Sequence, residues 1–319
     1  MSKYVLIDAN SFVHRSYHGY EPMLNAKGED HRVLHGFMQL LSDLPELIEN
    51  IEYLYMIFDP EDGSLFRKSI FPAYKANRSP HPADLITQQK HAEDFIRNTL
   101  GVPMLHYNGY EADDIIGSYA HYLDKQGHEV VVVSPDKDLF QMVNKNINML
   151  RPVKRKDKNG VSRKTYEWIT EKGVVDVFGV TADKIPDFLA LMGDTVDNLP
   201  GVHKVGAIKA AQLLAEFPSL EHIIAMAPHM AGKLGDNIRA ALSYMPIVKV
   251  LATVVKDLPI VERAEKSLAY AIEIQSATDY QNKMYQMQDY YKWPARFIDI
   301  FVQEEEEENK TSSSNHMKP

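Results

Sequence analysis

Three short apolar runs lie in the first half of the chain, and they constrain the fold more than any other feature. They are YVLID (4–8), YLYMIF (53–58) and EVVVVS (129–134), all rich in β-branched and aromatic residues. Nearly continuous apolar runs of this length are typical of strands buried on both faces of a parallel sheet. The segments between them have helical patterns, so we expect a β-α-β alternation and an α/β domain over residues 1–165.

The helical patterns between the runs have recognisable ends. HRVLHGFMQLLSDL (31–44) is the first, and the second, DLITQQKHAEDFIRNTLG, stops at the glycine Gly101. A third helix begins within GYEADD (109–114), because apolar residues recur from Ala112 to Leu123 at intervals of three and four.

The remainder of the chain changes character. After about residue 166 the pattern is helical, and we expect a helical lobe over residues 166–290. Within 183–217, two helices flank a tight loop that contains Gly201 and Gly206. Residues 303–319 include five consecutive glutamates that belong to no core, so we expect a disordered acidic tail.

Several protein classes are excluded by what the sequence lacks. It has no cysteine, which rules out disulfides, zinc thiolate sites and thiol nucleophiles and fits a reducing compartment. MSKYVLIDAN has no charged region followed by a long apolar stretch, and no run of 18 apolar residues exists. We therefore expect a cytoplasmic protein without a membrane partner. The glycine patterns of Rossmann and P-loop proteins are absent, so we expect no nucleotide cofactor.

The charge distribution is uneven. A net charge of −9 argues against a nucleic-acid partner. However, residues 67–78 carry four basic side chains and no acidic one, and residues 151–164 carry seven basic side chains against Asp157 alone. Taken alone, such stretches are as compatible with solvated loops as with a polyanionic partner.

Carboxylates gather at positions where parallel strands and helices would end. Asp8 and Asp59 end the first and second runs, and the carboxyl ends of parallel strands form the edge where ligands bind. The full set comprises nine acids on five segments: Asp8, Asp59, Glu111, Asp113, Asp114, Asp136, Asp138, Asp194 and Asp197.

Each of these acids alone has an ordinary explanation. An Asp after a strand is often a turn former or an N-cap, and acids in a first helical turn complement the helix dipole. Taken together that explanation fails, because caps do not require five segments to place acids at one sheet edge. Divalent cations would remove the repulsion, and Mg²⁺ or Mn²⁺ prefers oxygen ligands. The number of acids indicates two ions, as in enzymes that displace phosphate esters.

Five motifs carry a family resemblance. They are VLIDANSFVHRSYH (5–18), FDPEDGSLFRKSIFPAYKANR (58–78), GYEADD (109–114), SPDKDLFQMV (134–143) and GDTVDNLPGVHKVGAIKAAQLL (193–214). In this order they resemble the 5′-nuclease (flap endonuclease) family, specifically the 5′-3′ exonuclease domain of bacterial DNA polymerase I and its stand-alone relatives. The resemblance implies a PIN-like α/β nuclease core with a mostly parallel central sheet. It also implies a helical arch at about 66–95 and a helix–three-turn–helix DNA-binding lobe.

The resemblance also implies a function and assigns the acids to two sites. The function is metal-dependent hydrolysis of DNA near 5′ flaps or 5′ ends, by a monomer. The ligands of the family's tighter metal site are matched by Asp8, Asp59, Glu111, Asp113 and Asp114. The ligands of its second metal site are matched by Asp136, Asp138, Asp194 and Asp197.

Basic and aromatic residues of two motifs match positions that contact DNA in the family. Tyr74, Lys75 and Arg78 match the arch, and Lys75 resembles the lysine that reaches the scissile phosphate. Arg15 and Arg67 match positions that contact phosphate.

The hairpin loop departs from the family pattern. Family loops carry three glycines and bind K⁺, whereas here Lys204 stands between Gly201 and Gly206 in place of the middle glycine. We expect K⁺ binding at this loop to be disturbed, or Lys204 to contact phosphate itself.

Two alternatives remain open at this point. One is a DNA-structure-binding protein of the same fold with weak or no cleavage, and the other is a PIN-type ribonuclease. A phosphatase that begins with an apolar strand ending in Asp would usually carry a second acid two residues on, where this chain has Asn10.

Overall fold

The computed structural model describes residues 1–60, 65–156, 160, 162–259, 284, 287, 288 and 290–297. These residues form two compact units. The first takes in residues 1–11, 52–80 and 104–259, and the second takes in 12–51, 81–103 and the described residues between 284 and 297. All nine candidate acids lie in the first unit.

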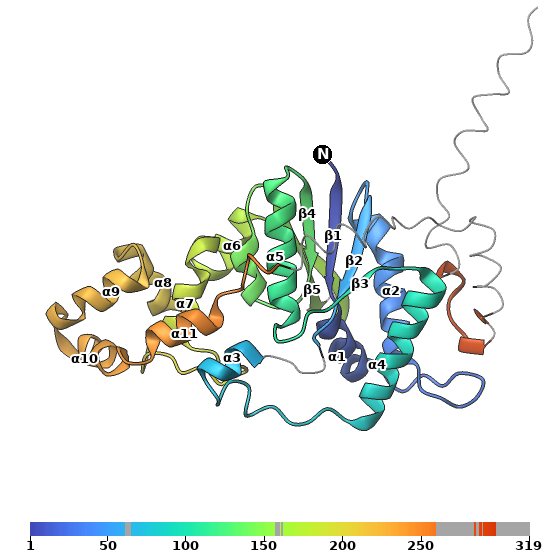
Figure 1. Ribbon diagram of the computed structural model, residues 1–319, viewed down its shortest axis with the longest axis horizontal. Helices are drawn as coiled ribbons and strands as arrows, with labels where there is room; N and C mark the ends of the chain where they lie inside the picture. Colours follow the sequence, from blue (N-terminus) through green and yellow to red (C-terminus); the bar gives the residue numbers. More distant parts are fainter. Residues whose placement is uncertain are drawn as a thin grey trace, which may run out of the picture. The chain divides into compact units, whose positions relative to one another are not determined.

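A six-stranded sheet forms the centre of the first unit (Figure 1). Its strands are β1 (Lys3–Asp8), β2 (Tyr53–Ile57), β3 (Met104–Leu105), β4 (Glu129–Val133), β5 (Ile147–Lys156) and β6 (Ser162–Ile169). They lie in the order β3-β2-β1-β4-β5-β6, and every neighbouring pair is parallel except β5 and β6. The predicted mostly parallel sheet and its three apolar strands are therefore confirmed.

The register of the central strands determines where the acids emerge. Asp8 is aligned with Ile57, the last residue of β2, so Asp59 follows just beyond the same edge of the sheet. Ile7 is aligned with Val133, the last residue of β4, and Ser134 therefore follows beside Asp8. The apolar residues before each of these ends are buried, which keeps the strand ends in place.

Helix α5 (Ala112–Lys125) packs against β1, β2 and β4 (Figure 1). Its apolar residues, among them Ile115, Ile116 and Leu123, are buried at helical spacing, as the sequence predicts. Its N-terminus has a capping box. The Glu111 side chain accepts from the amide of Asp114, and the Asp114 side chain accepts from the amide of Glu111.

The basic stretch 151–164 belongs largely to the hairpin of β5 and β6. Leu150 is aligned with Val133 at the end of β4, so residues 151–156 continue past the carboxyl edge of the parallel strands. Six residues of strand span about 20 Å. Lys154 is aligned with Lys164 on this extension, and both are exposed. Like charges directly opposite each other are unfavourable and are better tolerated beside an anion.

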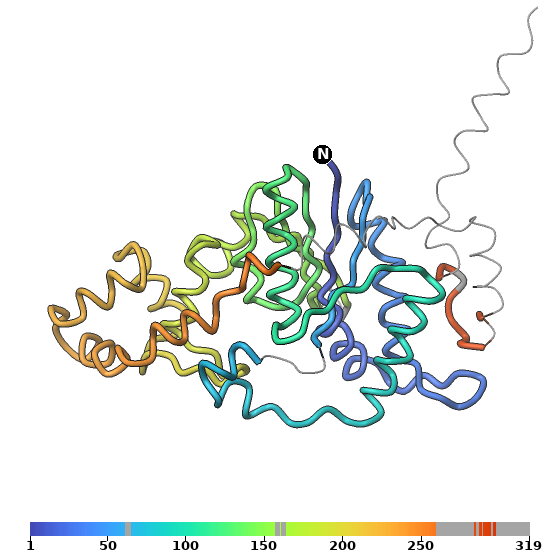
Figure 2. The backbone as a smooth tube through the Cα atoms, viewed as in Figure 1, coloured from blue at the N-terminus to red at the C-terminus, as the bar shows by residue number. Residues whose placement is uncertain are grey.

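The helices that follow the sheet in the first unit include a helix pair around the expected loop. The set is α6 (Glu171–Phe178), α7 (Ile185–Met192), α8 (Ala207–Glu216), α9 (Leu220–Met226), α10 (Gly232–Ala241) and α11 (Met245–Ala252). Helices α7 and α8 flank the loop 193–206, and α7 packs against both α8 and α11. Figure 2 shows this yellow-to-orange part of the chain as a run of short helices. The unit also contains α3 (Leu65–Ile70).

The second unit contains α2 (Arg32–Leu47) and α4 (Ala83–Phe95), which pack against each other. A π-helical turn, Ile96–Leu100, extends α4 to Gly101, whose φ of 69° is the left-handed stop expected from the sequence. Helix α1 (Ala9–Gly19) starts in the first unit and continues in the second.

Some expectations fall outside these residues. The acidic tail at 303–319 and part of the lobe, 260–283, lie outside the described residues. The division into a core over 1–165 and a lobe over 166–290 stays a prediction. Within the described ranges, no helix has both the length and the apolar character required to cross a membrane.

Candidate active site

The ends of β1 and β4 hold two of the predicted acids in one hydrogen-bonded chain. Ser134 donates to Asp8 Oδ2 at 2.6 Å, and the amide of Ser11 donates to Asp8 Oδ1 at 3.1 Å. The Ser134 hydroxyl in turn accepts from the amide of Asp136 at 3.0 Å. Asp138 joins the chain through its amide, which lies 2.9 Å from Asp136 Oδ1. The turn after β4 thus links Asp136 and Asp138 to Asp8 at the end of β1.

The first turn of α5 brings a second set of acids to the same edge. The amide of Ala112 donates to Asp59 Oδ1 at 2.7 Å, which joins the end of β2 to the start of α5. Glu111 is buried and is the N-cap of α5, whereas Asp113 is half-buried. The helix N-terminus favours negative charge at all of these positions.

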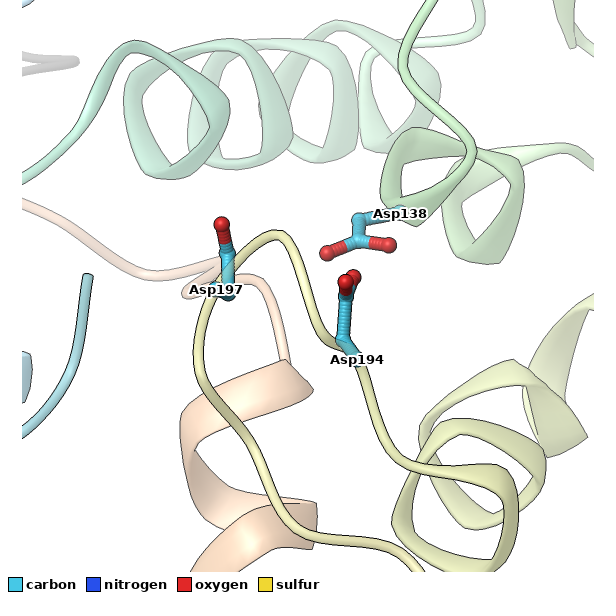
Figure 3. A group of neighbouring side chains, drawn as sticks. All are labelled: Asp138, Asp194 and Asp197. Carbon is cyan, nitrogen blue, oxygen red and sulfur yellow. The ribbon is translucent and has the colours of Figure 1, made fainter. Parts of the chain in front are cut away.

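Asp138, Asp194 and Asp197 form a third set that could hold a metal ion. One carboxylate oxygen of each lies within 4.8 Å of the others. Figure 3 shows Asp138 and Asp194 with their carboxylates facing each other, one from the short helix η2 (Asp138–Met142) and one from the loop after α7. The loop is held tight, because the amide of Leu199 donates to the Asp194 carbonyl at 2.6 Å and Asn198 has a φ of 57°.

Three basic side chains neutralise these acids. Lys137 lies between two of them, hydrogen-bonding Asp194 and lying 3.0 Å from Asp138 Oδ1. Lys75 forms an ion pair with Glu111 and lies 3.9 Å from Asp197 Oδ2. Arg78 Nη2 lies 2.6 Å from Asp197 Oδ1.

The turn that carries Lys75 and Arg78 is hydrogen-bonded to the loop of Asp194 and Asp197. The amide of Lys75 donates to the Asp197 carbonyl at 3.1 Å, and the side chain of Asn198 donates to the Ala73 carbonyl at 2.7 Å. The buried Tyr74 hydroxyl lies 2.9 Å from both Glu111 Oε2 and Asp197 Oδ2, so it joins the two predicted ligand groups. Lys75 itself has a φ of 55°, a conformation that costs energy for a residue with a side chain and is common at functional sites.

The electrostatics of the site favour proton uptake when only protein atoms surround the acids. Burial, opposed by hydrogen bonds from Ser11 and Ser134, raises the pKa of Asp8 to about 6. Burial and the neighbouring Asp136 raise the pKa of Asp138 to about 7. Burial and the same Asp136 hold the pKa of Asp113 well above its usual range.

Basic neighbours reverse this effect at one position. Burial alone would raise the pKa of Asp197, but Lys75 and Arg78 hold it below its usual value. Burial alone would lower the pKa of Lys137, but Asp138 and Asp194 raise it instead. The lysine therefore stays charged between the two carboxylates.

Three predicted site residues have other surroundings. Arg67 is 3% exposed and Asp114 is 0% exposed, and they form a two-pronged ion pair with distances of 2.5 and 2.8 Å. Arg15 lies on α1 within the second unit. The roles predicted for these residues stay predictions.

In the loop between α7 and α8, Gly201 and Gly206 have different surroundings. A Cβ at Gly201 would lie 2.2 Å from the Met192 carbonyl oxygen, so close backbone packing requires glycine there. A Cβ at Gly206 would meet nothing within 4 Å. Lys204 is exposed and has a φ of 59°, so it adopts the left-handed conformation for which glycine is best suited.

The motif SPDKD predicts its two aspartates as ligands, but two further site residues, Ser134 and Lys137, also lie inside it. A signal was present, because a basic residue between two acids suggests a counter-charge and a hydroxyl at a strand end suggests a hydrogen-bond donor. Their partners, Asp194 and Asp8, lie 57 and 126 positions away in the chain. Only the folded arrangement identifies them.

The family follows from comparison with known proteins. A family model described as "5'-3' exonuclease, N-terminal resolvase-like domain" matches residues 3–204, and "5'-3' exonuclease, C-terminal SAM fold" matches residues 180–275. A 5'-3' exonuclease of Aquifex aeolicus is 34% identical over 224 residues, which are 70% of this chain and 73% of that protein. The chain belongs to the 5′-3′ exonuclease family.

A longer relative matches the same part of the chain, and a solved structure shares its fold. A DNA polymerase I of Caldicellulosiruptor bescii is 31% identical over 258 residues, and the matched part spans 81% of this chain but 29% of the polymerase. A structure of the bacteriophage T5 D15 flap endonuclease with DNA and metal ions has a TM-score of 0.62 at 17% identity, covering 89% of this chain and 98% of that one. At this identity the match confirms the PIN-like, resolvase-like fold.

Proposed function

We propose that this chain is a structure-specific 5′ nuclease that hydrolyses phosphodiester bonds of DNA at 5′ ends and 5′ flaps. The observation that carries the proposal is the convergence of Asp138, Asp194 and Asp197 within 4.8 Å, from segments that are far apart in the sequence. Membership of the 5′-3′ exonuclease family supports it. The T5 endonuclease, bound to DNA and metal ions, supports the substrate class.

The residues at this edge fit divalent cations. The candidate donors are carboxylate oxygens, the ligands that Mg²⁺ and Mn²⁺ prefer, and the sequence has no cysteine. We assign Asp8, Asp59, Glu111 and Asp113 to one ion and Asp136, Asp138, Asp194 and Asp197 to a second. Two divalent ions held there would lower the pKa of an attacking water and neutralise charge at the phosphate and the leaving oxygen. A K⁺ ion at the loop of Gly201, Lys204 and Gly206 is a further part of the proposal.

The side chains around the acids would place the DNA. Lys75 is held beside both acid groups by its ion pair with Glu111 and by the hydrogen bond from its amide to the Asp197 carbonyl. From there its ammonium can reach a phosphate oxygen bound at the same edge. Arg78, which is half-exposed, would contact a neighbouring phosphate. Arg15 is proposed to contact phosphate from α1.

The path of the duplex is suggested by the hairpin of β5 and β6. It extends past the carboxyl edge of the sheet with Lys154, Arg155 and Lys156 exposed. A positively charged extension beside the acids compensates for the repulsion that a net charge of −9 exerts on DNA. We propose that the protein acts as a monomer in the cytoplasm, on DNA alone and without a nucleotide cofactor.

The proposal predicts that cleavage depends on added Mg²⁺ or Mn²⁺. A 5′-flap duplex should be cut in the presence of either ion and left intact in EDTA, because the acids alone cannot activate water or neutralise the phosphate. The assay is gel analysis of a 5′-labelled flap, with a nicked duplex without a flap and a single-stranded RNA as controls. Full activity in EDTA contradicts the metal-dependent mechanism. Preference for the RNA would favour a ribonuclease, and binding of the flap without cleavage would favour a DNA-structure-binding protein.

The raised pKa values predict that Mn²⁺ binding strengthens with pH. Protons compete with the ion at Asp8, with a pKa of about 6, and at Asp138, with a pKa of about 7. The apparent affinity should therefore rise by up to roughly tenfold per pH unit for each proton displaced, and level off above pH 7. Isothermal titration between pH 5.5 and 8.5, in buffers of different ionisation enthalpy, counts the released protons.

The same shifts set the stability of the metal-free protein. Both folded-state pKa values lie above the ordinary carboxyl value of 3.8, so between about pH 4 and 7 the folded protein binds more protons than the unfolded chain. These two groups stabilise the fold below pH 4 and lose that contribution as the pH rises through 6 and 7. Saturating Mn²⁺ should remove this loss, and pH-independent Mn²⁺ affinity would contradict the assignment.

A further inference from the structure

The carboxylate of Asp114 has no coordination site left for an ion. Its Oδ2 lies 2.5 Å from Arg67 Nη1 and accepts from the amide of Glu111 at 3.2 Å. Its Oδ1 accepts from Arg67 Nη2 at 2.8 Å and from the amide of Val255 at 2.9 Å. A carboxylate offers about four lone-pair sites, and these four donors occupy them. The side chain is 0% exposed, which separates it from the half-buried Asp113 beside it.

The guanidinium of Arg67 is equally committed to protein acceptors. Besides Asp114, it donates through Nε to the Leu251 carbonyl at 2.8 Å and through Nη2 to the Thr253 carbonyl at 3.1 Å. Its Nη1 lies 3.3 Å from Glu111 Oε2. Because the side chain is 3% exposed, a DNA phosphate could reach it only after these bonds break.

The carbonyls that Arg67 contacts belong to a segment that returns from the helical part of the unit. We call residues 251–258 the return segment; it starts in the last turn of α11 and runs along α5. Buried Gln141 fixes it from the other side, donating to the Ala252 carbonyl at 3.0 Å and accepting from the amide of Val254 at 2.9 Å. The return segment therefore has its backbone groups paired by buried side chains of the nuclease core.

Helix α5 is shaped to receive the return segment. Ser118 donates to the Val255 carbonyl at 3.0 Å and accepts from the amide of Leu258 at 3.2 Å. A Cβ on Gly117 would lie 2.2 Å from Val254 Cγ1, so only glycine permits this approach. The return segment is consequently held in a fixed position along α5, the helix that starts at the candidate ligands Glu111 and Asp113.

We propose that Arg67 and Asp114 are a positioning pair, and that they are neither a phosphate contact nor a metal ligand. This inference rests on the proposed nuclease function for its catalytic consequence. The pair ties α3, which leads into the turn of Tyr74 and Lys75, to the start of α5 and to the return segment. Glu111 is held at both its amide, by Asp114, and its carboxylate, by Arg67. The pair thereby sets the distance between Glu111 and Lys75.

Metal binding separates a positioning residue from a ligand. Asp114→Asn should bind the same number of Mn²⁺ ions as the wild type, with affinities within about threefold. Asp113→Asn, at the neighbouring position, is the matched control and should lose more than tenfold in affinity or one ion entirely. The titration uses Mn²⁺ alone, without DNA. If Asp114→Asn loses an ion as Asp113→Asn does, Asp114 is a ligand and the inference is wrong.

The salt dependence of DNA binding tests Arg67 in the same way. Each lost phosphate contact should reduce the slope of log K against log salt by about one. Arg67→Met should leave the slope of flap binding unchanged, whereas Arg78→Ala should reduce it. A reduced slope for Arg67→Met would identify a phosphate contact and overturn the inference. If Arg67→Met does not fold, Arg67→Lys decides by the single-turnover cleavage rate, since a lysine would retain a phosphate contact but cannot form the two-pronged pair. Its affinity should stay within about threefold of the wild type with a rate at least tenfold lower, and a wild-type rate would overturn the pair.

Catalysis separates positioning from support of the fold. With Mn²⁺ saturating and at a temperature where the variant is folded, Asp114→Asn should cut at least tenfold more slowly. Ser118→Ala is the control, because it removes bonds to the return segment without touching Glu111 or Arg67. It should lower the melting midpoint yet keep the single-turnover rate within about twofold. If metal-loaded Asp114→Asn cleaves at the wild-type rate, the pair only supports the fold, and the proposal is wrong.

The measurements also separate this inference from the proposed function. Mn²⁺ titration and the salt slope need no cleavage, so they decide the roles of Asp114 and Arg67 even if the wild-type protein cuts no DNA. In that case the nuclease proposal fails while the assignment of the pair is still decided.

Discussion

Asp138→Asn is expected to lower the single-turnover cleavage rate of a 5′-flap substrate at least about a hundredfold while DNA binding persists or tightens. Losing an electrostatic stabiliser of the transition state costs about 3 kcal/mol or more, and that energy corresponds to such a factor. Removing a negative charge also reduces repulsion of the DNA backbone. The measurement is single-turnover kinetics beside flap affinity determined without divalent metal.

The structure makes Asp138 a cleaner test than Asp197. The Asp138 carboxylate pairs with Lys137 and faces the carboxylate of Asp194, so the substitution disturbs one ion pair. Asp197 also holds Tyr74 and Arg78, and Asp197→Asn would loosen the arch turn in addition to removing a ligand. Asp197→Asn should be equally slow. Only Asp138→Asn, however, tests the loss of an ion ligand without also releasing Tyr74 and Arg78.

Two further variants set the limits of this test. Asp176→Asn removes an exposed acid on α6 and should change neither rate nor Mn²⁺ binding. Asp8→Asn should be as inactive as Asp138→Asn and should also weaken Mn²⁺ binding in the absence of DNA. If Asp138→Asn cleaves within a few-fold of the wild type, the second group is not catalytic, and a DNA-structure-binding protein becomes the better description.

The sequence predicts the sheet well where burial alone decides. β1, β2 and β4 are continuous apolar runs, and their ends place Asp8, Asp59 and Asp136 by the geometry of parallel strands. It does not predict β5 and β6, because RPVKRK combines a proline with four basic residues and has low strand propensity. Pairing with β6 forms this part of β5 in spite of its composition, and a local sequence pattern does not contain that interaction.

The acids of the site are predictable from sequence, but their partners are not. Spacing indicates that Glu111, Asp113 and Asp114 start one helix, and charge repulsion indicates cations. The same spacing cannot distinguish Asp113 from Asp114, because the difference arises from Arg67, 47 positions away, and from the return segment. Likewise the contact of Tyr74 with Asp197 spans 123 positions and depends on how the loop after α7 packs.

Lys75→Ala is expected to slow cleavage by about a hundredfold or more while flap affinity stays within about threefold. One ammonium among many phosphate contacts adds little to binding, but the same charge at the scissile phosphate acts where negative charge builds up in the transition state. The structure holds Lys75 beside the candidate acids, through its ion pair with Glu111 and the hydrogen bond from its amide to the Asp197 carbonyl. Single-turnover rates and equilibrium binding of the flap, at the same salt concentration, provide the comparison.

The backbone of Lys75 allows a sharper version of this experiment. Because its φ is 55°, Lys75→Gly removes the side chain and relieves the left-handed strain, whereas Lys75→Ala keeps the strain. If the ammonium is what matters, the two variants should be equally slow.

Lys68→Ala, at an exposed position on α3, controls for the loss of a nearby charge and should cleave at close to the wild-type rate. Neither Lys75→Ala nor Lys75→Gly should bind Mn²⁺ more weakly than the wild type, because both remove the ammonium that competes with Mn²⁺ for the Glu111 carboxylate. Wild-type cleavage by Lys75→Ala would remove Lys75 from the scissile phosphate, and a fast Lys75→Gly beside a slow Lys75→Ala would assign the effect to the backbone of the turn.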